Sequence, residues 1–455
     1  MTSYSPLSLS RLQEHIRSTL FPWGGHKALG IGFLLAGVCA GVAVRAGMLW
    51  FVDVRSDAGD AVGYLNAARN LLEYSIYSLD ENSAPVPGFY RPPLYSFFVA
   101  LVTGTFGRNL LALQIAQIVV SLVSALLATR IAARYAPAAA PWVFGLMLLS
   151  PFEAVYTAVA MSEALTAFLL VASAYALLML EGSKRWSIGG VLLGLCALAR
   201  DIYLPLSMAV AFAWLVFGKG AKASRVADAA ILVICSCLVV LPWTLRNYLV
   251  ADRFVPVSEG RLGFSLWVGT WATNTEFTRR DAEGQRVYPP EAYRNQEEKS
   301  RMDEALAQFD QGRGREADFA FRRLASQRMH DEPLAVLGRY IVRAPKLWFG
   351  TRFDLFQLNA NWFPRGSRSW TAVKVALWGL NALFTLLCFA GIVITFSRRN
   401  PIAILVLPIV YTALIYFPLN SFEIRYSLPV YPFVLVFAGI AAAWFIDKAG
   451  AAAKQ

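Results

Sequence analysis

The chain has 455 residues, of which 57% are hydrophobic and 16% are charged, and its formal net charge is +12. Soluble globular proteins carry about 25% charged residues, so this composition excludes a soluble enzyme, a disordered chain and a small disulfide scaffold. Ten membrane spans of about 20 residues would take roughly 200 positions, which leaves the rest for loops and one modest polar domain. The sequence therefore predicts an all-α polytopic membrane protein.

Apolar runs predict ten membrane-spanning helices. These runs cover 28–51, 109–130, 138–152, 162–180, 186–199, 202–217, 226–246, 371–396, 400–417 and 427–446. A further run at 92–107 has about 16 residues, which is short for a span, so we expect it to lie at the membrane surface. Because some runs are short and one is ambiguous, we expect about 10 to 12 transmembrane helices in total.

Basic residues in the loops predict the orientation of the spans. If both ends of the chain are cytoplasmic, the inner loops contain Arg130, Arg134, Lys184, Arg185, Lys219, Lys222, Arg225, Arg398 and Arg399. The short outer loops then contain only Arg200 and Arg425. Lys and Arg are enriched in cytoplasmic loops of membrane proteins. The pattern therefore favours cytoplasmic ends and an inner, multi-pass membrane location.

Two outer segments are predicted between the spans. The first is the loop 52–107, in which Asp60–Leu72 has the apolar periodicity of a surface helix. The second, 251–370, is the only polar domain. We therefore expect an N-terminal transmembrane module at 1–250, an outer domain at 251–370 and C-terminal transmembrane helices at 371–455.

Charged side chains gather at the predicted outer ends of the spans. They are Asp57, Asp60, Arg91, Glu163, Arg200, Asp201, Arg246, Glu423 and Arg425. Charges at a membrane boundary are costly unless they are paired or solvated, so this collection predicts a site at the outer surface. Ordinary explanations also exist: Arg200 and Arg246 can reach lipid head groups, Glu163 can cap its helix, Asp57 and Asp60 can be solvated loop residues, and Arg425 can pair with Glu423.

At these residues the chain resembles the GT-C membrane glycosyltransferases, especially the family 39-like branch of protein O-mannosyltransferases and the lipid A aminoarabinose transferase. The first-loop resemblance is carried by Asp60-Ala-Val-Gly-Tyr64 and Tyr90-Arg-Pro-Pro-Leu-Tyr95. Later elements are Met161-Ser-Glu-Ala-Leu165, Gly190 to Arg200, Pro242-Trp-Thr-Leu-Arg-Asn247 and Glu423-Ile-Arg-Tyr-Ser-Leu-Pro-Val-Tyr-Pro432. The resemblance runs from about 28 to 445. It implies the GT-C fold, with interfacial helices in the first periplasmic loop and one small periplasmic domain.

The resemblance also implies an activity. GT-C enzymes of this branch transfer a sugar, with inversion, from a polyprenyl-phosphate donor to a lipid, glycan or protein hydroxyl on the periplasmic face. Asp60 matches the first-loop aspartate and is expected to act as general base, with Asp57 as the alternative. Glu163 is expected to bind sugar hydroxyls or to orient the acceptor.

Other residues of the same motifs are expected to hold the substrates. A guanidinium stays charged and donates paired hydrogen bonds to phosphate oxygens. The candidates for the donor phosphate are Arg91, Arg246 and Arg425. Tyr64, Tyr90, Asn247 and Tyr426 are candidate substrate contacts. Trp243, Trp267 and Trp271 would line a groove for the isoprenoid tail or belong to an interfacial aromatic belt.

No cofactor is expected. The family has both metal-dependent and metal-independent members, and the few carboxylates and the absence of a histidine cluster in the outer segments favour the second group. The alternative functions are a transporter or flippase of lipid-linked sugars, a glycan polymerase or ligase, and a structural membrane anchor. A transporter should carry polar groups near the bilayer midplane. Nucleic-acid binding is not expected, because the basic surplus lies in cytoplasmic loops.

Overall fold

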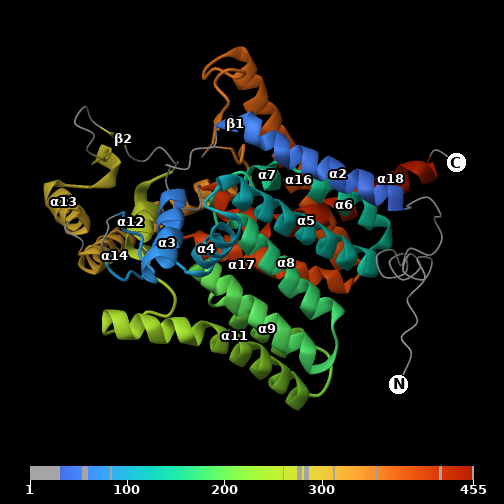
Figure 1. Cartoon of the computed structure of the whole chain (residues 1–455), viewed down its shortest axis with the longest axis horizontal. Helices are drawn as coiled ribbons and strands as arrows, with labels where there is room; N and C mark the ends of the chain where they lie inside the picture. The colour runs from blue at the N-terminus through green and yellow to red at the C-terminus, as the bar shows by residue number, and fades with distance from the viewer. Residues whose placement is uncertain are drawn as a thin grey trace.

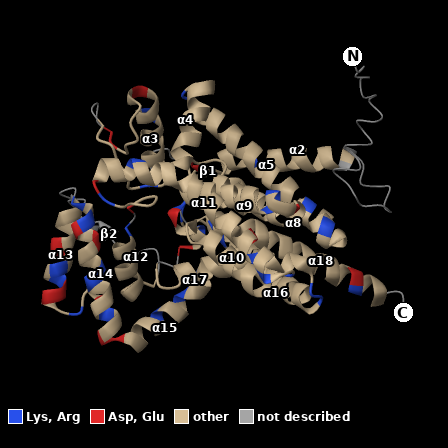
Figure 2. Cartoon of the chain, turned by 90° about the horizontal axis from the view of Figure 1, so that it is seen from below, with Lys and Arg blue, Asp and Glu red and all other residues tan. Residues whose placement is uncertain are grey.

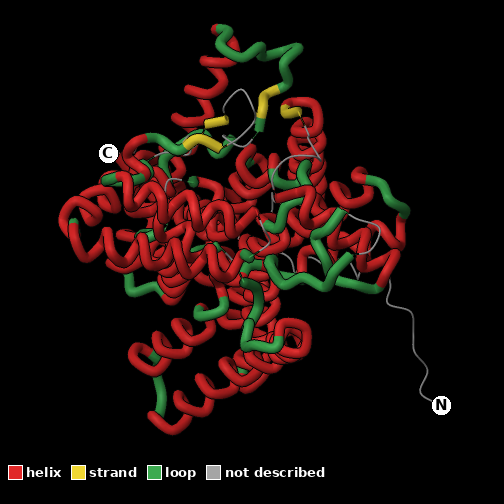
Figure 3. Tube along the Cα trace, turned by 90° about the vertical axis from the view of Figure 1, so that its left-hand side faces the viewer, coloured by secondary structure: helices red, strands yellow, loops and turns green. Residues whose placement is uncertain are grey.

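The computed structural model describes residues 31–53, 60–81, 85–259, 261–273, 279–280, 286–310, 313–353, 356–419 and 423–452. Across these residues helices dominate, and the only strands are four of two residues each (Figure 3). Strand β1 (Val52–Asp53) pairs antiparallel with β4 (Gln357–Leu358), and β2 (Arg279–Arg280) pairs with β3 (Arg286–Val287). The predicted all-α class is confirmed.

Each predicted apolar run is mainly helical where the structure describes it, although the run 138–152 is divided at Ser150 and the run 202–217 contains a turn at Leu204 and Pro205. The long helices are α2 (Ile31–Phe51), α5 (Leu110–Tyr135), α11 (Lys222–Ala251), α16 (Arg368–Ser397) and α18 (Tyr431–Ala452). Shorter apolar helices are α4 (Leu94–Phe106), α6 (Ala140–Leu149), α7 (Pro151–Val155), α8 (Glu163–Met179), α9 (Gly182–Ala199), α10 (Leu206–Phe217) and α17 (Val406–Tyr416). Among the described residues, six helical stretches are long and apolar enough to cross a membrane. The total of about 10 to 12 crossings remains a prediction.

Short 3-10 helices join several of these elements. They are η1 (Pro137–Ala139), η2 (Asp201–Tyr203), η3 (Pro290–Ala292), η4 (Ala344–Leu347), η5 (Pro401–Leu405) and η6 (Ile424–Val430). Local sequence explains other boundaries. The side chain of Asn109 accepts a hydrogen bond from the Leu111 amide at the start of α5, and Ser367 caps α16 in the same way. Pro242 lies inside α11, where it removes one backbone hydrogen bond, and α11 bends along its length (Figure 1).

The bundle packs closely where glycines face neighbouring helices. Helix α9 runs along α11, and α16 runs along α18. A Cβ atom at Gly190 would collide with the backbone of α11 at Leu232, and one at Gly391 would collide with the backbone of α18 at Phe437. Small residues allow such close approach of helices in membranes, where lipid supplies no hydrophobic force between them.

The helices of the first loop and of the region 251–370 lie at one end of the molecule. They are α3 (Asp60–Tyr74), α12 (Leu262–Trp271), α13 (Gln296–Asp310), α14 (Gly314–Asp331) and α15 (Pro333–Arg343). Figure 1 shows α3 and α12 to α14 opposite the end where α18 finishes, and Figure 2 shows charged residues concentrated on α13 and α14. The first-loop helix α3 packs on α4.

Helices α12 to α14 have a hydrophobic core of their own. Trp267, which is fully buried, packs against Phe264, Phe321 and Tyr288. Trp271 is 6% exposed in the same core. The expectation that these two tryptophans line a lipid groove or an interfacial belt is therefore wrong. Helix α12 is apolar nearly all round because it is the central helix of this core and not because it meets lipid.

Candidate active site

Asp60 lies between two arginines that come from distant parts of the chain. It is the first residue of α3, where a carboxylate is favoured by the helix dipole. Its Oδ1 accepts a hydrogen bond from Arg91 Nη2 at 2.7 Å, and its Oδ2 accepts one from Arg425 Nη1 at 3.2 Å. Arg91 precedes α4, whereas Arg425 belongs to η6 before α18. The structure thus brings together three of the residues that the motifs singled out.

Arg425 also joins Asp60 to a second acid. Its Nε donates to Glu423 Oε2 at 2.8 Å, so the pair considered in the sequence is present together with the bond to Asp60. The Arg425 guanidinium lies 5.0 Å from the centre of the Tyr426 ring, and that ring stacks on Tyr416 with centroids 4.7 Å apart. The stacked tyrosines therefore hold one side of the site.

Glu163 belongs to the same cluster through Arg200. Glu163 begins α8 and is 2% exposed, and its Oε1 accepts a hydrogen bond from Arg200 Nη1 at 2.9 Å. The Arg200 guanidinium lies 5.7 Å from the centre of the Tyr426 ring, whose other neighbour is Arg425. The sequence places Arg200 among the outer charges but gives it no catalytic or substrate-binding role, because a guanidinium at the end of a span also suits a lipid head group. The signal that could have included it was its position at the end of the Gly190 to Arg200 motif.

Tyr64 is a buried residue that packs against Arg91 of the cluster. Its side chain is 5% exposed, its hydroxyl bonds Ser162 Oγ at 3.4 Å, and its ring faces the Arg91 guanidinium at 5.2 Å. The Tyr95 ring meets it edge-on at 4.8 Å. Because Tyr64 is buried, we interpret it as a support for Arg91 and not as a direct substrate contact.

Three other candidates make their contacts elsewhere. Arg246 donates to the carbonyl of Gly88 at 2.5 Å and to that of Tyr77 at 3.3 Å, so it fastens α11 to the first loop. Asn247 is fully buried and donates to the carbonyls of Val255 and Val257.

Tyr90, the third of these, is 44% exposed and stacks on Phe89. Trp243 lies under the Arg246 guanidinium at 4.7 Å. The contacts of Arg246 and Asn247 with backbone carbonyls explain both residues as structural links between segments of the chain. Asp57, the alternative base, lies outside the described residues.

The arginines control the charge of Asp60. Burial by itself raises the pKa of this carboxyl, but the positive charges of Arg425 and Arg91 outweigh burial and hold the pKa at about 2. The cluster contains three acids, Asp60, Glu163 and Glu423, and three arginines. The formal charge of the cluster is therefore zero. An anionic ligand would have to compete with the carboxylates for the hydrogen bonds that the guanidinium groups donate. Among the described residues, no three His, Cys, Asp or Glu side chains are placed to hold a metal ion.

The chain is similar to known proteins in fold but not in sequence. No family model and no curated protein sequence matches it. Among solved structures, the oligosaccharyltransferase AglB of Archaeoglobus fulgidus, in complex with an inhibitory peptide and a dolichol-phosphate, matches 91% of this chain and 50% of that chain, with 14% identity and a TM-score of 0.50. The same archaeon's oligosaccharyltransferase tethered to an acceptor peptide matches 93% and 51%, with 12% identity and a TM-score of 0.50.

A bacterial structure is also similar. ArnT from Cupriavidus metallidurans, bound to undecaprenyl phosphate, matches 91% of this chain and 78% of that chain, with 14% identity and a TM-score of 0.45. This chain spans about half the length of the archaeal enzymes. The two archaeal matches show that this chain shares the fold of those oligosaccharyltransferases, and the six long apolar helical stretches among its described residues are of a length and composition that can cross a membrane.

Proposed function

We propose that the protein transfers a sugar from a polyprenyl-phosphate donor to a hydroxyl acceptor on the periplasmic side of the inner membrane, with Asp60 as the general base. The observation that carries this proposal is the Asp60 carboxylate, one third exposed, between Arg91 and Arg425. Such a transfer needs a carboxylate to take the acceptor's proton and cations to stabilise the leaving phosphate. Both are present within one hydrogen-bonded group.

The same arginines account for the timing of proton transfer. A carboxyl with a pKa of about 2 is ionised but weakly basic. When the donor phosphate binds, Arg91 and Arg425 turn part of their hydrogen bonding to it, so Asp60 loses positive charge and its pKa rises toward the ordinary value. Asp60 therefore becomes a stronger base when the leaving group is in place.

Glu163 acts through Arg200 in this proposal. The Glu163 side chain is 2% exposed and the Arg200 side chain is 14% exposed, so the arginine is the more accessible partner. The buried carboxylate fixes the guanidinium, and the guanidinium contacts the sugar or the phosphate. This replaces direct binding of sugar hydroxyls by Glu163.

Donor class and orientation rest on separate support. The archaeal neighbour with the same fold was solved with a dolichol-phosphate, which is a polyprenyl-type phosphate. The positive-inside pattern of the loops supports a periplasmic position for α3 and for α12 to α15. The site also lies at one end of the helical bundle, whereas a transporter should bind its substrate near the midplane.

The test is a transfer assay with purified protein in nanodiscs, labelled polyprenyl-phosphate sugars and a panel of lipid, glycan and peptide acceptors. Wild type should form a glycosidic bond, and Asp60→Asn should slow its formation by about 10²–10⁴-fold. Glu73→Gln is the matched control, because Glu73 lies on the same helix but pairs with Arg108. Movement of the donor across the bilayer without bond formation would instead identify a flippase.

A further inference from the structure

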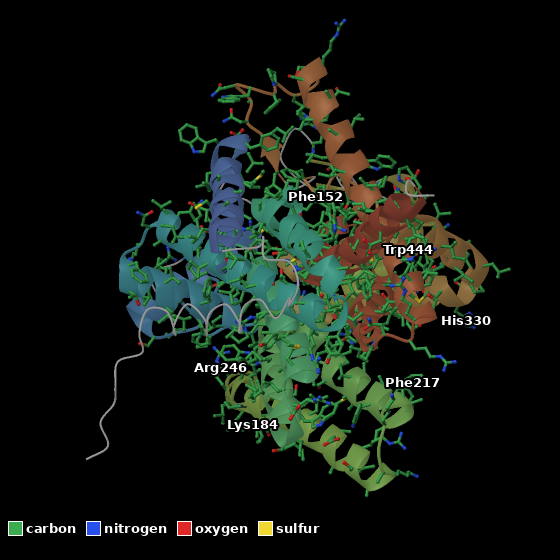
Figure 4. The ribbon with its side chains drawn as sticks, turned by 90° about the vertical axis from the view of Figure 1, so that its right-hand side faces the viewer. Phe152, Lys184, Phe217, Arg246, His330 and Trp444 are labelled. Atoms are coloured by element: carbon green, nitrogen blue, oxygen red, sulfur yellow. The ribbon has the colours of Figure 1, made fainter. Side chains whose placement is uncertain are left out.

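A small internal cavity touches the Glu163 side chain. It lies between α5, α7, α8 and η6, and its polar lining residues are Ser121, Ser124, Glu153, Tyr156 and Glu163. Every residue that lines it is buried. The space open to the centre of a water-sized sphere is about 10 Å³, which is about the room that one water molecule needs. Phe152, labelled in Figure 4, directly precedes the lining residue Glu153 in the sequence and locates the cavity in the bundle.

Three polar atoms on lining residues are buried without a hydrogen-bond partner. They are Ser124 Oγ, Glu153 Oε1 and Glu163 Oε2, on residues that are 3%, 8% and 2% exposed. Ser121 is different, because its Oγ accepts hydrogen bonds from Arg45. A buried polar atom without a partner costs about 1–3 kcal/mol. Three residues carrying such atoms around one water-sized space indicate a shared ligand.

The two glutamates differ in their neighbours. The other oxygen of Glu163 is bound to Arg200, so its negative charge is compensated. Glu153 makes no ion pair within the part of the chain that the structure describes. Arg45 and Arg352 act on Glu153 electrostatically, but neither forms an ion pair with it. The Arg45 guanidinium binds Ser121 and backbone carbonyls, and Arg352 binds Asn381, Ser427 and a carbonyl. A buried carboxylate without a paired cation is unfavourable compared with the neutral acid.

We propose that the cavity binds one water molecule that links Glu153, as a neutral carboxylic acid, to the ionised Glu163. The water accepts a hydrogen bond from the protonated Oε1 of Glu153 and donates to Glu163 Oε2 and Ser124 Oγ. These three bonds are the number that a buried water typically makes. One proton on the pair also removes the repulsion between two carboxylates in a low-dielectric interior.

Glu153 is thereby a positioning residue. It acts through the water on Glu163, and Glu163 holds Arg200 in the candidate active site. Only the effect of Glu163 on Arg200 in catalysis rests on the proposed function. The protonation of Glu153 and the bound water are argued from the cavity and its lining residues. A protein without transferase activity could still show both, so the two proposals fail separately.

Infrared spectroscopy of the full chain in nanodiscs at pH 7 tests the proton. Wild type should show the C=O stretch of a protonated, buried carboxyl that shifts in D₂O. Glu153→Gln should remove that band, whereas Glu163→Gln and Ser124→Ala should keep it at a changed frequency. Glu181→Gln is the control, because Glu181 is exposed and should leave the band unchanged. A band that persists in Glu153→Gln overturns the proposal, as does a wild-type band that appears only when Na⁺ is replaced by choline, which would indicate a cation.

Thermal unfolding gives a second readout. Glutamine mimics a neutral glutamic acid, so Glu153→Gln should leave the Tm within about 1 °C of wild type, a difference that corresponds to about 1 kcal/mol at about 2.1 cal/mol/K per residue over the 455 residues. Glu163→Gln should lower it by more, because the charge of Arg200 loses its carboxylate. Equal losses in the two variants would mean that Glu153 is ionised, and the proposal would then be wrong.

Discussion

Replacing Asp60 by asparagine separates the chemical role of this residue from its structural one. The fall of its pKa from 3.8 to about 2 corresponds to about 2.4 kcal/mol at 1.36 kcal/mol per pH unit. Because the side chain is 33% exposed, solvent screening reduces the contribution to about 1 kcal/mol. The asparagine side chain would still accept one hydrogen bond. We therefore expect a loss of about 1 kcal/mol in stability, but a loss of about 10²–10⁴-fold in transfer rate if Asp60 is the base.

The assay measures sugar transfer and thermal unfolding on the same preparations of wild type, Asp60→Asn and the control Glu73→Gln. The pH dependence gives an independent check. The folded-state pKa is depressed, so the stabilisation from Asp60 is complete above about pH 4 and is lost as the pH falls toward 2. Between about pH 4 and pH 2, the difference in unfolding free energy between wild type and Asp60→Asn should therefore disappear. Full transfer activity in folded Asp60→Asn would refute the assignment of the base.

Other variants test the remaining parts of the site and fold. Arg425→Lys should raise the KM for the donor about tenfold or more, because one ammonium cannot keep the paired contacts of a guanidinium; an unchanged KM in a donor titration would contradict its phosphate role. Arg246→Ala should cost about 1–3 kcal/mol in unfolding experiments, because the Gly88 carbonyl loses its guanidinium donor whereas the Tyr77 carbonyl keeps the Gly88 amide, and its donor KM should stay near wild type. Trp267→Ala should cost about 3–5 kcal/mol and expose α12 to α14 to proteolysis; unchanged protease resistance would be inconsistent with its burial.

The apolar runs and the boundary charges could be recognised in the sequence because each depends on near neighbours along the chain. A helix in lipid must satisfy its backbone internally, so a long run of apolar residues leaves few alternatives to a helix. Asp60 and Glu163 stood out in the same way, since a carboxylate at the start of an apolar or amphipathic helix is visible within a few positions. Periodicity also predicted the surface helix that begins at Asp60.

Tertiary structure decided which charges meet. The sequence gives Arg91, Arg246 and Arg425 the same expected role at the donor phosphate. The fold distinguishes two of them: Arg425 binds Asp60, 365 positions away, whereas Arg246 binds the first loop. The same holds for Trp267, whose sequence suits a lipid belt as well as a core. Side-chain composition states what a residue can bind, whereas its partner depends on helix packing between segments far apart in the chain. The cavity beside Glu153 and Glu163 also depends on the tertiary structure, because a space for one water molecule arises only where the side chains of neighbouring helices do not fill the volume between them.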